Sequence, residues 1–218
     1  GFAVKIPLLP LHIWLPEAHV EAPTPGSVIL AGILLKLGTY ALIKLLLQST
    51  LIIFQDLWFF IFIWSFMGLV YPSLVAFSQI DVKKIIAYSS VAHMNFSLIG
   101  LFGLNMFGLV GCVYMMLGHA VTSGALFFGL GVLYDRYKTR IIFYYGGIVL
   151  FMPIFSIFFL IFVLSNFAFP GSINFVGEIL ILLGAFEVSN VIMIFASFGL
   201  ILSLIYSLLF YNRVFFGF

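Results

Sequence analysis

The sequence predicts an all-α membrane protein, a polytopic transmembrane helical bundle in which residues 1–218 form a single membrane domain. Three observations support this prediction. Hydrophobic residues make up 64% of the chain and charged residues only 7%, whereas a soluble domain carries about 25% charged residues. The mean hydropathy is +1.29. The apolar residues are also gathered in runs of about 20, the length that crosses the hydrocarbon layer of a bilayer.

The apolar runs define the expected spans. Five runs are long enough for one helix each: 26–47, 57–78, 84–104, 108–133 and 189–211. The run 148–184 is too long for one straight helix and contains Pro170 followed by Gly171, so it predicts a broken span. Residues 1–16 resemble the end of a further span, with a second break near Pro7. We expect about six spans plus a partial one.

Basic residues are concentrated in the loops on one side of the predicted bundle. The cations are Lys83 and Lys84 in the loop 79–84, Arg136, Lys138 and Arg140 in the loop 134–141, and Arg213 after the last span. The alternate loops, around 48–56, 105–107 and 185–188, contain Asp56 and Glu187 but no lysine or arginine. The acidic loop 17–25 on the basic side is the exception. This asymmetry predicts that the basic loops face the inner compartment.

Several classes of function are disfavoured by composition. The net charge of +2 is small and no basic cluster is dense, so nucleic acid is not an expected partner. The single cysteine, Cys112, lies in an apolar run, which excludes a disulfide framework and a cysteine-rich metal site. The sequence contains no nucleotide-binding loop, haem ligand pair or iron–sulfur spacing. We therefore expect no cofactor, metal or redox centre in this chain.

Lys36 is the first candidate functional residue. It lies in "GSVILAGILLKLGTYALIKLLL", about 15 Å from Gly26 along a helix, which is about half the hydrocarbon thickness. A lysine at that depth costs about 2.5–3.5 kcal/mol on insertion scales. A lysine without its hydration can exchange a proton near neutral pH. The alternative is a structural lysine held by a carboxylate or by backbone carbonyls. Lys44, nearer the helix end, is expected to reach the interface.

Two further charged residues lie beside the predicted breaks. Lys5 precedes Pro7, where a broken helix would free carbonyls that could hold an ammonium or water, but it could equally be an interfacial lysine. Glu178, in "PGSINFVGEILILLGAF", follows Pro170 and is the only carboxylate in its run. Glu178 is a candidate proton carrier or a partner for a lysine, and structural pairing alone is the alternative.

Histidines complete the set of candidates. His119 lies midway along its span, with Thr122 and Ser123 on the same helical face, and is a plausible proton-relay residue. His93 has Ser89 and Ser90 on its face and supports the same interpretation less strongly. For both residues, a packing histidine is the alternative. We interpret His12 and His19, which frame "HIWLPEAH", as packing residues or residues that give access to the surface.

The pattern as a whole indicates proton or cation transfer. Several spans each contribute a titratable group at depth, and two spans are broken. A series of such groups is what transfer of protons or cations through a membrane requires. No pocket for a large substrate is evident.

Long stretches of the chain resemble the antiporter-like membrane subunits of respiratory complex I. The stretches are "FAVKIPLLPLHIWLPEAHVEAPTPGSVILAGILLKLGTY", "QIDVKKIIAYSSVAHMNFSLIG", "GHAVTSGALFFGLGVLYDRYKTR", "PGSINFVGEILILLGAF" and "YSLLFYNRVFFG". They occur in the family's order and cover essentially the whole chain. The resemblance implies half of an inverted-repeat antiporter-like fold, cut at both ends.

The resemblance also implies roles for the candidate residues. The family's central polar axis has a lysine on the first broken helix, a lysine on the next helix and a lysine or glutamate on the second broken helix. These positions match Lys5, Lys36 and Glu178, and the histidine on the intervening helix matches His119. The family pairs its first lysine with a glutamate two helices earlier. We expect a neighbouring chain or segment to supply that carboxylate.

The resemblance implies an enzyme complex, an H+-translocating NADH:ubiquinone reductase. NADH, FMN, the iron–sulfur clusters and ubiquinone would be bound by other subunits. The expected partners are other membrane-arm subunits and lipid, and the expected location is the mitochondrial inner membrane, with loops 79–84 and 134–141 on the matrix side. Two alternatives stay open: a subunit of a multisubunit cation/proton antiporter, which shares this ancestry, and a structural fragment of the membrane arm that moves no protons.

Overall fold

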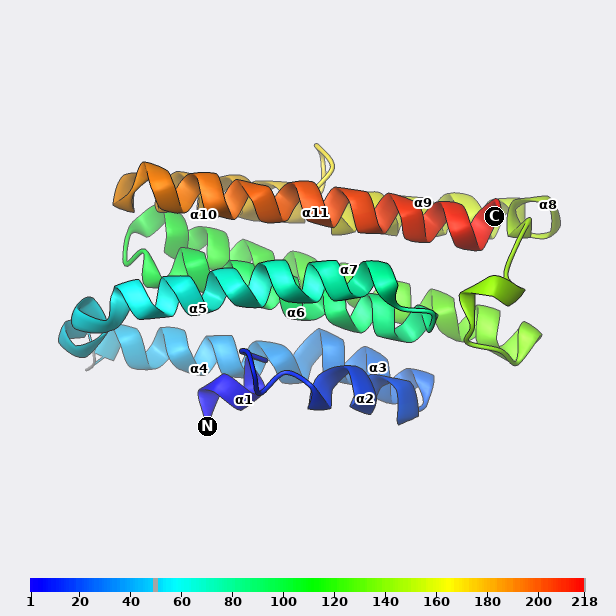
Figure 1. The fold of residues 1–218 in the computed structure, drawn as a ribbon, viewed down its shortest axis with the longest axis horizontal. Helices are drawn as coiled ribbons and strands as arrows, with labels where there is room; N and C mark the ends of the chain where they lie inside the picture. The colour runs from blue at the N-terminus through cyan, green and yellow to red at the C-terminus, as the bar shows by residue number, and fades with distance from the viewer. Residues whose placement is uncertain (49–50, 218) are drawn as a thin grey trace.

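In a computed structural model the chain forms a bundle of helices that run along the long axis of the molecule (Figure 1). The structure describes the backbone of residues 1–48 and 51–217 and the side chains of residues 1–45 and 59–217. The helices are α1 (Phe2–Lys5), α2 (Trp14–Glu21), α3 (Thr24–Ile29), η1 (Leu30–Leu34), α4 (Leu35–Gln48), α5 (Leu51–Ser78), α6 (Val82–Phe102), α7 (Met106–Tyr137), η2 (Ile142–Tyr144), α8 (Ile148–Phe151), α9 (Pro153–Asn166), α10 (Ile173–Val188) and α11 (Asn190–Phe215). Within the described ranges, β structure is limited to one isolated bridge, between Asp81 and Ile141.

The predicted spans are present as helices. In the part of the chain that the structure describes, five helical segments are long and apolar enough to cross a membrane: Thr24–Leu45, Phe59–Ser78, Val82–Phe102, Met106–Tyr137 and Asn190–Phe215. These correspond to the five uninterrupted runs of the sequence. The predicted loop around 48–56 is partly helical, because α4 ends at Gln48 and α5 begins at Leu51. The side chain of Asp56 in that segment lies outside the described residues. The all-α prediction is confirmed.

Both predicted breaks are also confirmed. The chain leaves the helix between α9 and α10 at residues 167–172, where Ala168 (φ 57°) and Gly171 (φ 101°) adopt left-handed backbone conformations. Ser172 then begins α10 by accepting a hydrogen bond from the N–H of Phe175. At the N-terminal end, residues 6–13 separate α1 from α2 and contain Pro7 and Pro10. A proline inside a helix removes a hydrogen-bond donor, which accounts for this break.

One irregular element has no counterpart in the expectations. Residues Leu30–Leu34 form a π-helical turn, η1, between α3 and α4, and the span is otherwise continuous. In this turn the N–H of Leu35 bonds to the carbonyl of Leu30, five residues earlier. Such wide turns within α-helices are rare and occur frequently at functional sites. This turn ends two residues before Lys36.

Helix α6 forms the centre of the bundle, and 94% of its membrane window is buried inside the protein. Helices α7 and α10 pack very closely beside it. A Cβ atom added at Gly184 of α10 would lie 2.6 Å from the backbone nitrogen of Gly108 in α7. Glycine at this crossing therefore allows two backbones to touch. The close contact fixes the position of α10, and with it Glu178, against α6 and α7.

Basic residues hold the end of the bundle at which α2, α7 and α11 finish. The Lys83 ammonium donates to the carbonyl of Ala22 at 2.9 Å, and Arg140 Nη1 donates to the carbonyl of Val20 at 2.5 Å. Both acceptors lie at the C-terminal end of α2, where helix carbonyls lack partners and cations are favoured. The loop expected at 79–84 is shorter than predicted, because α6 begins at Val82 and Lys83 is only 3% exposed.

Candidate functional site

Lys36 is the second residue of α4 and lies two residues after the end of the π-helical turn. Its ammonium donates to the carbonyl of Ala31 at 2.5 Å. The wide turn explains this contact, because the N–H of Leu35 bonds to Leu30 and leaves the Ala31 carbonyl open to the side chain. No carboxylate within the described part of the chain forms an ion pair with Lys36. The half-buried ammonium is thus held by the backbone rather than by a fixed counter-ion.

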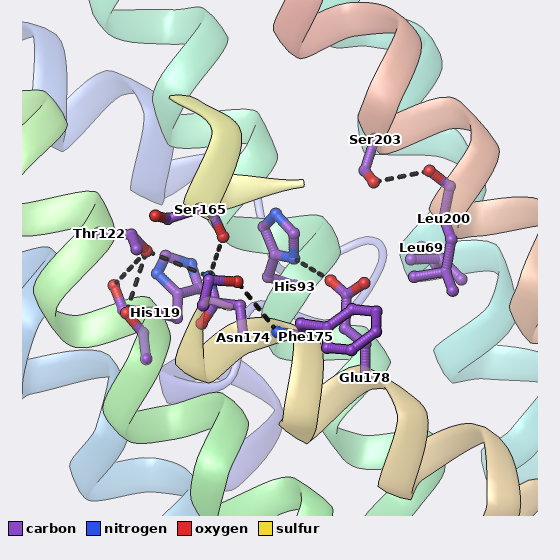
Figure 2. Close-up of polar contacts among 12 residues, drawn as sticks. Leu69, His93, His119, Thr122, Ser165, Asn174, Phe175, Glu178, Leu200 and Ser203 are labelled. Carbon is purple, nitrogen blue, oxygen red and sulfur yellow. Dashed lines mark hydrogen bonds and ion pairs between the residues drawn. The ribbon is translucent and has the colours of Figure 1, made fainter. Parts of the chain in front are cut away.

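Glu178 of α10 and His93 of α6 form a buried pair (Figure 2). Glu178 Oε1 lies 3.7 Å from His93 Nδ1, and each side chain is 4% exposed. On the opposite side of the imidazole, His93 Nε2 lies 3.4 Å from the hydroxyl of Tyr206 on α11. Glu178 Oε1 has no hydrogen-bond partner among the described atoms. An uncompensated buried carboxylate is costly, and His93 is the ionisable group that lies beside it.

His119 of α7 lies beside His93. The two rings meet edge to face with their centroids 5.3 Å apart. Neither ring nitrogen of His119 has a hydrogen-bond partner among the described atoms. Glu178, His93 and His119 therefore form a buried row that crosses from α10 through α6 to α7.

The hydroxyl groups expected beside the histidines bond elsewhere. Thr122 donates to the carbonyls of Gly118 and His119 at 3.1 and 3.4 Å, and Ser123 donates to the His119 carbonyl at 2.6 Å. Thr122 and Ser123 lie on the predicted helical face, but their hydroxyl groups bond to the backbone of α7 and not to the imidazole of His119. Ser89 and Ser90 likewise donate to the carbonyl of Ile86. Hydroxyl groups in helices commonly bond to the carbonyl three or four residues earlier. The helical spacing predicted the face on which these side chains lie, but not their hydrogen-bond partners.

Lys36 lies on the part of α4 that faces His119. The hydroxyl of Thr39 contacts Met116 Sδ at 2.5 Å and joins α4 to α7. Lys36 is three residues before Thr39, and His119 is three residues after Met116, so both share the contacting faces. A Cβ added at Gly32 of η1 would lie 3.8 Å from the Ala120 carbonyl, which places η1 beside the same turn of α7.

Lys5 lies apart from this buried row. It is the last residue of α1 and is exposed on the surface of the bundle. A Cβ added at Gly38 would lie 3.1 Å from Lys5 Cβ, so the base of the side chain packs against α4, two residues from Lys36. No described carboxylate forms an ion pair with Lys5. The freed carbonyl of Pro7 is bound instead by the Asn95 amide, at 3.2 Å.

The two remaining histidines are buried among aromatic rings. His19 is fully buried and stacks on Phe127, with the ring centroids 4.4 Å apart and the planes 7° from parallel. His12 lies with its ring edge towards Tyr71, at a centroid distance of 5.6 Å. Aromatic stacking of this kind fits the packing interpretation of both residues.

Two polar residues near the site were missed from the sequence. Asn174 donates to the carbonyl of Ser165 at 2.9 Å and to the hydroxyl of Thr122 at 3.4 Å (Figure 2). It therefore connects the start of α10 to the end of α9 across the break, and also to α7. Asn174 precedes Glu178 by one helical turn, and that spacing was the available indication. Tyr206 was hidden in an apolar run and gave no such indication.

The chain matches the family described as NADH:quinone oxidoreductase/Mrp antiporter, transmembrane, over residues 1–205. It is 55% identical to NADH-ubiquinone oxidoreductase chain 4 of Marchantia polymorpha, over all of this chain and 44% of that one. It is 49% identical to NADH-quinone oxidoreductase subunit M of Rhodobacter capsulatus, over all of this chain and 42% of that one. The chain thus spans less than half the length of these relatives.

Solved structures give the same result. The structure of respiratory complex I from Thermus thermophilus with bound NADH contains a chain that superimposes with a TM-score of 0.93 at 31% identity, over 98% of this chain and 46% of that one. A chain of the Mrp complex from Dietzia sp. DQ12-45-1b also gives a TM-score of 0.93, at 21% identity over all of this chain and 41% of that one, which shows a shared fold. This chain belongs to the NADH:quinone oxidoreductase/Mrp antiporter transmembrane family.

Proposed function

We propose that the chain is a proton-translocating part of the membrane arm of complex I, and that residues 1–218 act as one membrane module. The observation that carries the proposal is the buried row of Glu178, His93 and His119, with Lys36 on the facing side of α4. Titratable groups at this depth are costly, and a scaffold would be more stable with apolar residues in their place. The identity to NADH-ubiquinone oxidoreductase chain 4 supports the same assignment.

The row suggests a route for the proton. Lys36 would exchange a proton with His119 through water, since the contact between Thr39 and Met116 joins their helices. His119 would pass it to His93 across the edge-to-face contact, and His93 Nδ1 would pass it to Glu178 Oε1. Lys5, at the surface beside α4, would receive its carboxylate partner from a neighbouring chain or segment.

The surroundings of the chain follow from the same proposal. NADH, FMN, iron–sulfur clusters and ubiquinone would be held by other subunits, and the partners would be membrane-arm subunits and lipid. The location would be the mitochondrial inner membrane, as for a relative of NADH-ubiquinone oxidoreductase chain 4. The end of the bundle that carries Lys83 and Arg140 would face the matrix, in keeping with the positive-inside rule.

The decisive experiment replaces Lys36 with alanine in the assembled complex in sealed vesicles. We expect both quinone reduction and proton uptake to fall about a hundredfold, the lower end of the range for removing a proton-transfer group from its reaction. Lys44→Ala is the matched control, since Lys44 is an exposed lysine on the same helix. Normal rates in the Lys36→Ala complex would make Lys36 structural, held by the Ala31 carbonyl alone. Proton uptake that requires sodium and not quinone would indicate the cation/proton antiporter instead.

A further inference from the structure

Tyr206 occupies a position that the proposed route does not use. It lies on α11, is 3% exposed, and places its hydroxyl 3.4 Å from His93 Nε2. The other nitrogen of the same ring, Nδ1, lies 3.7 Å from Glu178 Oε1. One imidazole therefore connects the phenol to the carboxylate, with a different nitrogen facing each.

Three small cavities meet at Tyr206. The first, which we call the carboxylate cavity, is lined by Glu178, His93, Ser73 and Ser203 together with apolar residues and Tyr206 itself. Its volume is about 10 Å³, close to the smallest space that holds one water molecule. It lies between α5, α6, α10 and α11, directly beside the buried pair.

The other two cavities lead away from that pair. The serine cavity is lined by Tyr206, Ser89, Asn166 and Ser207, and the basic-end cavity by Tyr206 and Arg213 among apolar side chains. Each also has a volume of about 10 Å³. The three spaces therefore form a series along α11 that runs from the carboxylate towards the basic end of the bundle.

The first two cavities offer suitable partners to water. Ser73 and Ser203 donate their protons to the carbonyls of Leu69 and Leu200, so their oxygen atoms remain able to accept a hydrogen bond from water. Figure 2 shows Ser203 and Glu178 in this region.

The serine cavity has the same property. Ser89 donates to Ile86 and Ser207 donates to Leu204. A buried water needs two to four polar partners, and both cavities provide them.

The last part of the series is apolar. Phe210 and Ile85 line both the serine cavity and the basic-end cavity, and Phe77 and Ile142 line the latter. Tyr206, Phe210 and Arg213 follow one face of α11 at a spacing of four and three residues. A hydrophobic constriction of this kind conducts only when it is wetted, so it would limit a passive leak of protons.

We propose that Tyr206 is a proton-relay residue that connects the Glu178–His93 pair to the basic end of the bundle through these three cavities. In the relay step the phenol O–H bond breaks as the proton moves to His93 Nε2. A water in the serine cavity gives a proton to the phenol oxygen and takes one up from the aqueous phase at the basic end, so no hydroxide is left behind. His93 in turn releases its Nδ1 proton to Glu178. No net charge stays on Tyr206. This inference rests on the proposed function, because it supplies protons to the same carboxylate.

The test uses the assembled complex in sealed vesicles and the substitution Tyr206→Phe, which keeps the ring and removes only the hydroxyl. We expect proton uptake to fall about a hundredfold. Without the hydroxyl, water alone must deliver the proton to His93. A lower pH at the basic end offers more protons to that water, so we also expect the deficit in proton uptake to shrink as this pH is lowered. Tyr211→Phe is the matched control, since Tyr211 lies on the same helix and its hydroxyl only donates to the carbonyl of Ser156, at 3.1 Å.

A second variant separates the relay from packing. Ser207→Leu fills the serine cavity, which excludes its water, and leaves the Tyr206 hydroxyl in place, so it should lower proton uptake to a similar extent. Normal uptake in both variants overturns the relay, and so does a deficit in Tyr206→Phe that does not change with pH. Glu178→Gln distinguishes the two proposals: if Glu178→Gln strongly lowers uptake and both relay variants are normal, only the relay fails. If Glu178→Gln is itself normal, the proposed function fails.

Discussion

Glu178 and His93 lie 3.7 Å apart in the interior of the bundle, on helices α10 and α6, and each side chain is 4% exposed. The pair sits immediately after the break that separates α9 from α10 and is enclosed by α7 and α11. At this separation the carboxylate and the imidazole do not share a hydrogen bond, so a proton passes directly between them only when the two side chains move closer. Motion of α10 relative to α6 would change that separation.

Replacing Glu178 with glutamine keeps the shape of the side chain and removes its ability to exchange a proton. We expect proton uptake by the assembled complex to fall about a hundredfold. Glu187→Gln is the control, because Glu187 is an exposed carboxylate on the same helix. The measurement is the rate of proton uptake driven by quinone reduction in sealed vesicles. Equal rates in both variants would contradict a role for Glu178 in transfer.

Asn174 should be important for the stability of the second break. Asn174→Ala removes the part-buried hydrogen bond to the Ser165 carbonyl, a loss of about 0.5–1.5 kcal/mol, while the N–H of Ala168 still donates to that carbonyl. We expect a lower midpoint of thermal unfolding for the purified complex. Asn212→Ala changes an exposed asparagine and should leave the midpoint unaltered. If the two variants unfold at the same temperature, the amide does not stabilise the break.

Lys83 should hold the C-terminal end of α2. Lys83→Met keeps the apolar part of the side chain and removes the ammonium that donates to the Ala22 carbonyl, a bond to a charged group worth about 1.5–3 kcal/mol. We expect faster hydrogen exchange across residues 14–22 in the assembled complex. Lys84→Met provides the comparison, since Lys84 is one-third exposed and lies 4.0 Å from Asp81. Unchanged exchange in the Lys83→Met complex would show that α2 is held by packing alone.

The crossing of α7 and α10 should tolerate no side chain. In Gly184→Ala the new Cβ would lie 2.6 Å from the Gly108 nitrogen, so one backbone must move, at a cost of about 1–3 kcal/mol. We expect a reduced yield of assembled complex and weaker proton uptake, because Glu178 moves with α10. Gly124→Ala on α7 adds a Cβ at an ordinary 3.7 Å from Val28 and should assemble normally. Similar yields for the two variants would contradict the close-packing argument.

The sequence by itself determined the class of the fold, the spans and the two breaks. Apolar length decides whether a helix can cross a bilayer, and Pro7 and Pro170 mark places where the helical hydrogen bonds must stop. The depth of Lys36 also followed from position alone, because rise per residue converts sequence number into distance. Lys36 and Glu178 were therefore candidates before their contacts were known.

The tertiary structure decided which of these groups meet. His93, the weaker candidate, lies between Glu178 and Tyr206, and the serines expected to serve it bond to Ile86 instead. The Lys36 ammonium donates to the carbonyl of Ala31, which is exposed by a π-helical turn. No pattern of residues in the sequence predicted this turn. The physical reason is that the sequence does not fix the rotation of each helix about its own axis. Helices that are apolar on every side have no polar face to orient them, so packing alone decides which side chains meet across the bundle.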